Sequence, residues 1–87
     1  MASKHRKTYD AIFSNPIRAN ISWNDAVAMV KAFGGIVAPS GGSMHSFELN
    51  GVTGVFHKPH PGNELSKPRV RAFRSFLGEA GVDPDVL

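Results

Sequence analysis

The sequence predicts an α+β fold, a two-layer sandwich with elements in the order α-β-β-β-α and a three-stranded antiparallel sheet. Three features of the 87-residue chain lead to this prediction. Apolar residues recur with helical spacing toward both ends, they alternate with a period of two in the middle, and glycine-containing turns separate the alternating segments. A chain of this length without internal repeats is expected to form one domain, over residues 1–87.

A short helix is predicted near the start of the chain. Its apolar face consists of Tyr9, Ile12 and Phe13. Asn15-Pro16 ends it, because proline disfavours helical backbone in the preceding residue. The basic residues 1–8 are expected to be a flexible terminus, and Pro16–Ile21 a connector.

A longer helix follows the connector. Ser22 is a good N-cap residue, and Asp25 three positions later resembles a capping box. Gly34-Gly35 supplies the left-handed residue that ends the helix. The apolar face comprises Trp23, Ala26, Val27, Val30 and Phe33.

The period of two predicts three strands joined by two tight turns. The strands are Gly35–Pro39, Met44–Leu49 and Val52–His57. Gly41-Gly42-Ser43 forms the first turn, and Asn50-Gly51 the second, because a type I′ hairpin requires positive φ at both central residues.

A final helix is expected from about Lys67 to Ala80, after a loop at Lys58–Asn63 whose prolines cannot lie in a central strand. Gly81 ends the helix, and residues 83–87 form an acidic tail. With both amphipathic helices on one face of the strands, the order matches that of the double-stranded-RNA-binding fold. The apolar stripe of the last helix comprises Val70, Phe73, Leu77 and Ala80.

The charge distribution favours a polyanionic partner such as nucleic acid. The net charge is +3, and all ten lysines and arginines precede residue 75. Lys67, Arg71 and Arg74 share a helix face without interleaved acids, which suits contact with backbone phosphates. The alternative is a basic helix face that serves only solubility. Ser43 and Lys58, each beside a candidate histidine segment, are further candidates for RNA contact.

Composition excludes several classes of protein. The chain has no cysteine, so it can form neither a disulfide nor a cysteine-ligated metal site. No apolar run approaches the roughly 20 residues of a membrane helix, and the first ten residues lack the apolar segment of a signal peptide. We therefore expect a cytoplasmic protein with no membrane partner and no small-molecule cofactor.

His45 is the sharpest candidate for catalysis. Histidine can take and give a proton near neutral pH, and RNA cleavage needs a base for the ribose 2′-hydroxyl and an acid for the departing 5′-oxygen. The alternative is structural, because alternation puts His45 on the same face as Phe47 and Leu49 unless a bulge at the glycines turns it outward.

The other histidines are weaker candidates. His57 ends the third strand and His60 lies in the loop that follows it, where they could contact a phosphate or a partner protein, or simply be exposed. A metal site is disfavoured because no third ligand cluster accompanies them. His5 lies in the basic terminus and is expected to be inert.

A resemblance to a known family is carried by the segments Ala11-Ile12-Phe13-Ser14-Asn15-Pro16, Ile21-Ser22-Trp23, Gly42-Ser43-Met44-His45, Leu49-Asn50-Gly51-Val52, Val55-Phe56-His57-Lys58-Pro59-His60-Pro61, Phe76-Leu77 and Ala80-Gly81-Val82. Over roughly Tyr9 to Val82, the chain resembles the HicA family of bacterial toxins. The family's catalytic histidine follows a Gly-Ser pair at the start of the second strand, which corresponds to His45, although Met44 stands between Ser43 and His45 here.

The resemblance implies the toxin of a type II toxin–antitoxin system: a metal-independent mRNA interferase with a double-stranded-RNA-binding-like fold. It also implies a HicB-like antitoxin, expected to be acidic and to cover His45 and the basic helix. The rival hypothesis is a non-catalytic RNA-binding or protein-docking module on the same fold. DNA binding is less favoured because no helix-turn-helix pair is apparent.

Overall fold

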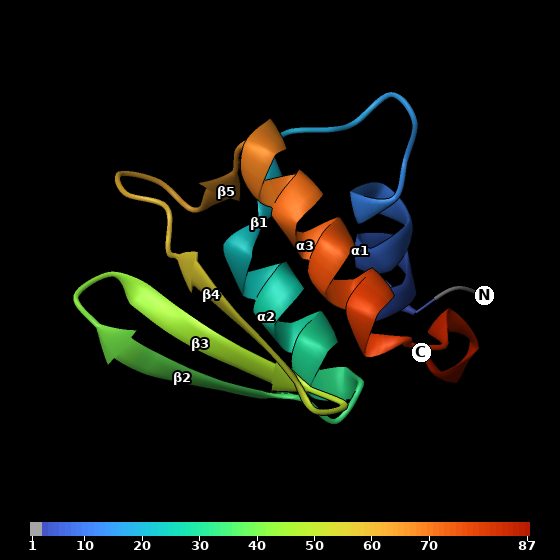
Figure 1. Cartoon of the computed structure of the whole chain (residues 1–87). Helices are drawn as coiled ribbons and strands as arrows, with labels where there is room; N and C mark the ends of the chain where they lie inside the picture. Colours follow the sequence, from blue (N-terminus) through green and yellow to red (C-terminus); the bar gives the residue numbers. More distant parts are fainter. Residues whose placement is uncertain (1–2) are drawn as a thin grey trace.

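The computed structural model describes residues 3–87 and confirms the predicted α+β class. Figure 1 shows α2 and α3 covering one face of the sheet, with α1 on the far side of these helices. Within residues 3–87, no helix combines the length and apolar character needed to cross a bilayer. The elements in order are α1 (Lys4–Ile12), β1 (Ile21–Ser22), α2 (Trp23–Ala32), β2 (Ile36–Gly41), β3 (Met44–Leu49), β4 (Val52–His57), β5 (Glu64–Leu65), α3 (Lys67–Ala80) and the 3₁₀ turn η1 (Pro84–Val86).

The main sheet is an antiparallel meander in the order β2-β3-β4, as predicted. Its second turn is the expected hairpin, in which Asn50 and Gly51 have φ of 51° and 81°. This turn fixes the register of β3 and β4, so that Phe47 lies opposite Gly54 and His45 opposite Phe56. Phe47 therefore lies at the centre of the sheet and His45 near its end.

An aromatic cluster forms the core between the sheet and the two covering helices. Phe47 is fully buried, and its ring makes edge contacts with Trp23 and Phe73, each with centroids 5.4 Å apart. Phe56 and Phe73 stack with centroids 4.2 Å apart. The predicted core positions of Trp23, Phe47 and Phe73 are confirmed, and the cluster joins β3, β4, α2 and α3 into one unit.

A second, two-stranded sheet was not predicted. Ile21 of β1 pairs with Leu65 of β5, and both side chains are buried. The predicted connector and exit loop therefore end in paired strands, which are too short to show any periodicity. The pair joins the start of α2 to the start of α3, and the main-chain N–H of Trp23 adds a hydrogen bond to the Asn63 carbonyl at 2.8 Å.

The N-terminal segment is helical from Lys4, which corrects the prediction of a flexible terminus over residues 1–8. Ser3 caps α1 by accepting a hydrogen bond from the Arg6 N–H. The Arg6 guanidinium also contacts Asp10 and Asp85, and these hydrogen bonds raise the pKa of Arg6 above its ordinary value. The acidic tail is thus held against α1 through η1. Residues 1 and 2 of the predicted terminus lie outside the described residues.

Candidate active site

His45 lies at the start of β3, just after the glycine turn. Gly41 and Gly42 have φ of 131° and 54°, and the pairing of β2 with β3 shifts register between Pro39 and Gly41. This bulge does not turn His45 outward. Its ring faces the helices and makes an edge contact with Trp23, with centroids 5.4 Å apart. The alternation with Phe47 therefore holds at this position too.

His45 is nevertheless only half-buried, because β3 begins at the rim of the aromatic cluster. Its Nδ1 lies 3.2 Å from the main-chain oxygen of Ser43. A carbonyl oxygen only accepts hydrogen bonds, so this contact requires the proton on Nδ1. In the neutral ring, Nε2 then carries the lone pair and can accept a proton.

Ser43 brings three of the predicted site residues together. Its main-chain oxygen accepts from the Lys58 N–H at 2.8 Å as well as from His45. Its hydroxyl oxygen lies 3.2 Å from Nδ1 of His57, which is exposed at the end of β4. Hydrogen bonds of Ser43 therefore link it to His45, His57 and Lys58 at this end of the sheet, and we call these four residues the Ser43 site.

Arg69 joins the Ser43 site and was missed by the sequence analysis. From the first turns of α3, its Nη1 donates to the main-chain oxygen of His57 at 2.8 Å. The predicted basic stripe comprises Lys67, Arg71 and Arg74, and Arg69 lies on a different face of the same helix. The sequence predicts that the last helix packs on the last strand. A basic side chain near the start of that helix was therefore a candidate for contact with the end of the strand.

The three residues of the predicted basic stripe have different surroundings. Lys67 and Arg71 are exposed on α3, as a phosphate contact requires. Arg74 is half-buried, and its Nε and Nη2 donate to the main-chain oxygens of Ile12 and Ser14 at the end of α1. These bonds correct the expectation that Arg74 presents its guanidinium to RNA. The sequence pattern could not show that the end of α1 packs beside this residue.

Replacing Arg74 with methionine is expected to destabilise the protein by about 1–3 kcal/mol, since two carbonyl oxygens lose their donor. The change in the free energy of unfolding can be measured by urea denaturation, with Arg71→Met as the control for loss of an exposed charge on the same helix. Equal stability of the two variants would contradict a structural role for Arg74.

The remaining predicted candidate, His60, is exposed in the loop between β4 and β5, apart from the hydrogen bonds of the Ser43 site. Among residues 3–87, no group of three or more histidine, aspartate or glutamate side chains is arranged to hold a metal ion. The side chains that the Ser43 site offers for chemistry are imidazole, hydroxyl and cationic groups.

The family model described as HicA toxin of bacterial toxin–antitoxin systems matches residues 23–82. This range contains the whole Ser43 site and the main sheet. Comparisons with curated proteins and with solved structures give no significant match.

Proposed function

The chain belongs to the HicA toxin family, and on that premise we propose that it is an endoribonuclease that cleaves mRNA by metal-independent acid–base catalysis and so arrests translation. His45 is the catalytic residue. The observation that carries this role is the orientation of its ring: Nδ1 is directed to the Ser43 oxygen, which leaves Nε2 as the basic nitrogen of a half-exposed imidazole.

The proposed reaction begins when Nε2 of His45 takes the proton of a ribose 2′-hydroxyl. The 2′-oxygen then attacks the adjacent phosphorus, and the bond from phosphorus to the 5′-oxygen of the next nucleotide breaks as that oxygen takes a proton from solvent water. His45 afterwards releases the proton it took from the 2′-hydroxyl to the solvent. The products are a 2′,3′-cyclic phosphate and a free 5′-hydroxyl. A nearby cation stabilises the negative charge that develops on the phosphate oxygens.

The residues around His45 supply contacts for the RNA strand. His57 and Lys58 are exposed at the same end of the sheet and would contact other phosphates of the bound strand. Lys67 and Arg71 extend the cationic surface along α3 and would hold the backbone without reading its bases. Arg69 holds the end of β4 through the His57 oxygen and so acts as a positioning residue.

A HicB-like antitoxin is the proposed protein partner, and one feature also favours the rival docking-module function. The sheet face opposite the helices carries exposed apolar side chains, with Ile36 65% and Val55 50% exposed. Such a face suits a protein contact. If docking were the sole function, the chain would bind its partner through this face and would not cleave RNA.

The direct test is to incubate the full chain with RNA in the presence of EDTA, beside an oligonucleotide of the same sequence with 2′-O-methyl groups. We expect cleavage of the RNA alone, leaving 2′,3′-cyclic phosphate ends that mass spectrometry identifies. Intact RNA under these conditions, with binding retained, would instead support the non-catalytic module.

A further inference from the structure

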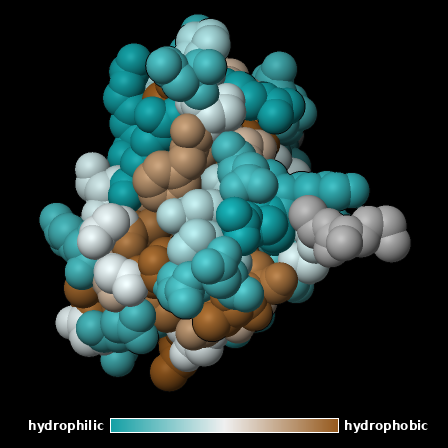
Figure 2. Space-filling model, turned by 90° about the vertical axis from the view of Figure 1, so that its right-hand side faces the viewer, coloured by the Kyte–Doolittle hydropathy of each residue, from teal (hydrophilic) through white to brown (hydrophobic). Residues whose placement is uncertain are grey.

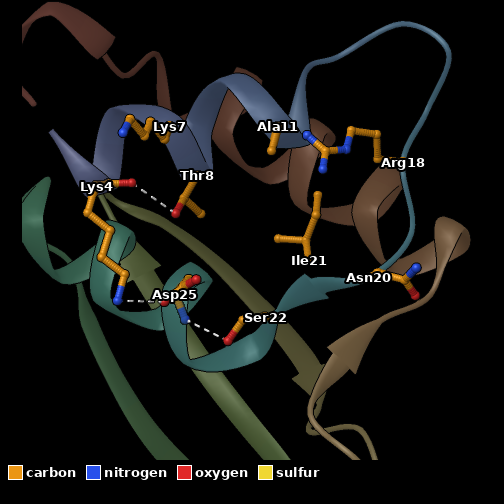
Figure 3. A pocket seen from close by; sticks show the side chains of 9 residues that line it. All are labelled: Lys4, Lys7, Thr8, Ala11, Arg18, Asn20, Ile21, Ser22 and Asp25. Carbon is orange, nitrogen blue, oxygen red and sulfur yellow. Dashed lines mark hydrogen bonds and ion pairs between the residues drawn. The ribbon is translucent and has the colours of Figure 1, made fainter. Parts of the chain in front are cut away.

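An open hollow of about 270 Å³ lies between α1, the connector and the start of α2, away from the Ser43 site. Figure 3 shows its lining, with the Arg18 side chain extending from the connector toward Ala11 and Ile21. Lys4 and Lys7 come from α1, and polar groups from the connector and β1 complete the wall. The lining residues are Lys4, Lys7, Thr8, Ala11, Arg18, Asn20, Ile21, Ser22 and Asp25.

Cations outnumber acids in this hollow. Lys4 contacts its one carboxylate, that of Asp25, at 3.2 Å. The ion pairs found within residues 3–87 use neither Lys7 nor Arg18. An anion bound by Lys7 or by Arg18 would therefore displace no internal ion-pair partner, and the contacts it gains would be charge-assisted hydrogen bonds.

The hollow is built almost wholly from residues outside the segment that the family model matches, since only Asp25 falls within residues 23–82. It lies toward the α1 side of the molecule, and Figure 2 shows hydrophilic side chains over the upper part of that side and apolar ones lower down. Its cations are thus an addition to the basic residues around the Ser43 site.

We propose that this hollow binds a backbone phosphate of the RNA strand, as a second anchoring point separate from the Ser43 site. The inference rests on the proposed ribonuclease function for the identity of the strand. The hollow is open rather than enclosed, which suits a group that belongs to a longer chain. A hollow of about 270 Å³ has room for one small charged group, so a phosphate is a better occupant than a protein surface.

The test is binding of a single-stranded 2′-O-methyl oligonucleotide to the full chain, measured by fluorescence anisotropy over a range of salt concentrations. Lys7→Gln and Arg18→Gln are each expected to weaken binding about tenfold at low salt, and to reduce the slope of log K against log salt by about 0.7. Lys31→Gln removes an exposed lysine outside the hollow and is the matched control, with a smaller change in affinity and slope.

Slopes for Lys7→Gln and Arg18→Gln equal to that of Lys31→Gln would overturn the proposal. The proposal would also fail if Lys7→Gln and Arg18→Gln bind polyglutamate more weakly than the unmodified protein does but bind the oligonucleotide equally well. The hollow would then be a contact for an acidic protein. The outcome is separable from the nuclease assignment: a chain that binds the oligonucleotide through Lys7 and Arg18 but cleaves no RNA keeps this site and loses the nuclease. If the chain cleaves RNA but its affinity for the oligonucleotide is unchanged in both variants, the nuclease assignment stands and the proposed site is lost.

Discussion

His45→Ala is expected to lower the rate of RNA cleavage by about 10²- to 10⁴-fold, the range typical for loss of a general acid or base. Binding of the 2′-O-methyl oligonucleotide should stay close to that of the unmodified protein, because His57, Lys58 and the cations of α3 remain. The two measurements together separate catalysis from affinity. Expression of the variant in bacteria should also fail to arrest growth.

The control for this experiment is His5→Ala, which removes a half-buried histidine of α1 outside the Ser43 site. That variant should cleave RNA at the original rate. If His45→Ala cleaves RNA as fast as His5→Ala does, His45 has no catalytic role and the imidazole is only part of the rim of the core.

Phe47→Ala should produce the largest loss of stability, about 3–5 kcal/mol in the free energy of unfolding. The Phe47 ring is fully buried and contacts four other aromatic rings, so its removal leaves a cavity that β3 cannot close. Small domains have a net stability of roughly 5–15 kcal/mol, so this single change would remove a large share. Urea denaturation followed by circular dichroism measures the effect.

Phe13→Ala provides the comparison, because Phe13 is 39% exposed at the end of α1. This variant should lose much less stability than Phe47→Ala. If the aromatic cluster is the core, the free energy of unfolding must fall much further in Phe47→Ala than in Phe13→Ala. A loss below about 1 kcal/mol for Phe47→Ala would mean that the aromatic cluster contributes little to the folded state.

Local signals in the sequence account for most of the fold. The Asn50-Gly51 turn was predictable because few residue pairs tolerate two positive φ angles. The start of α2 was predictable because the Ser22 hydroxyl accepts from the Asp25 N–H. The pairing of β1 with β5 was not, because each has two residues and their partners lie far apart in the chain.

The site was only partly predictable, because side-chain partners depend on packing. The glycine–serine turn indicated His45, but not that the Ser43 oxygen orients its ring. Charge spacing grouped Arg74 with Lys67 and Arg71, whereas α1 occupies the Arg74 guanidinium. The ordered start of α1 was missed for a related reason: its link to Asp85 joins opposite ends of the chain.

The acceptor that orients His45 is a main-chain atom, and every amino acid at position 43 would provide one. A substitution at Ser43 therefore keeps the group that selects the ring's tautomer and removes only the hydroxyl beside His57. The constraint moves instead to the glycines of the turn, which determine where that carbonyl is directed. A change of side chain at position 43 is thereby expected to preserve the direction of the imidazole, whereas a change at Gly41 or Gly42, which have positive φ, is expected to alter it.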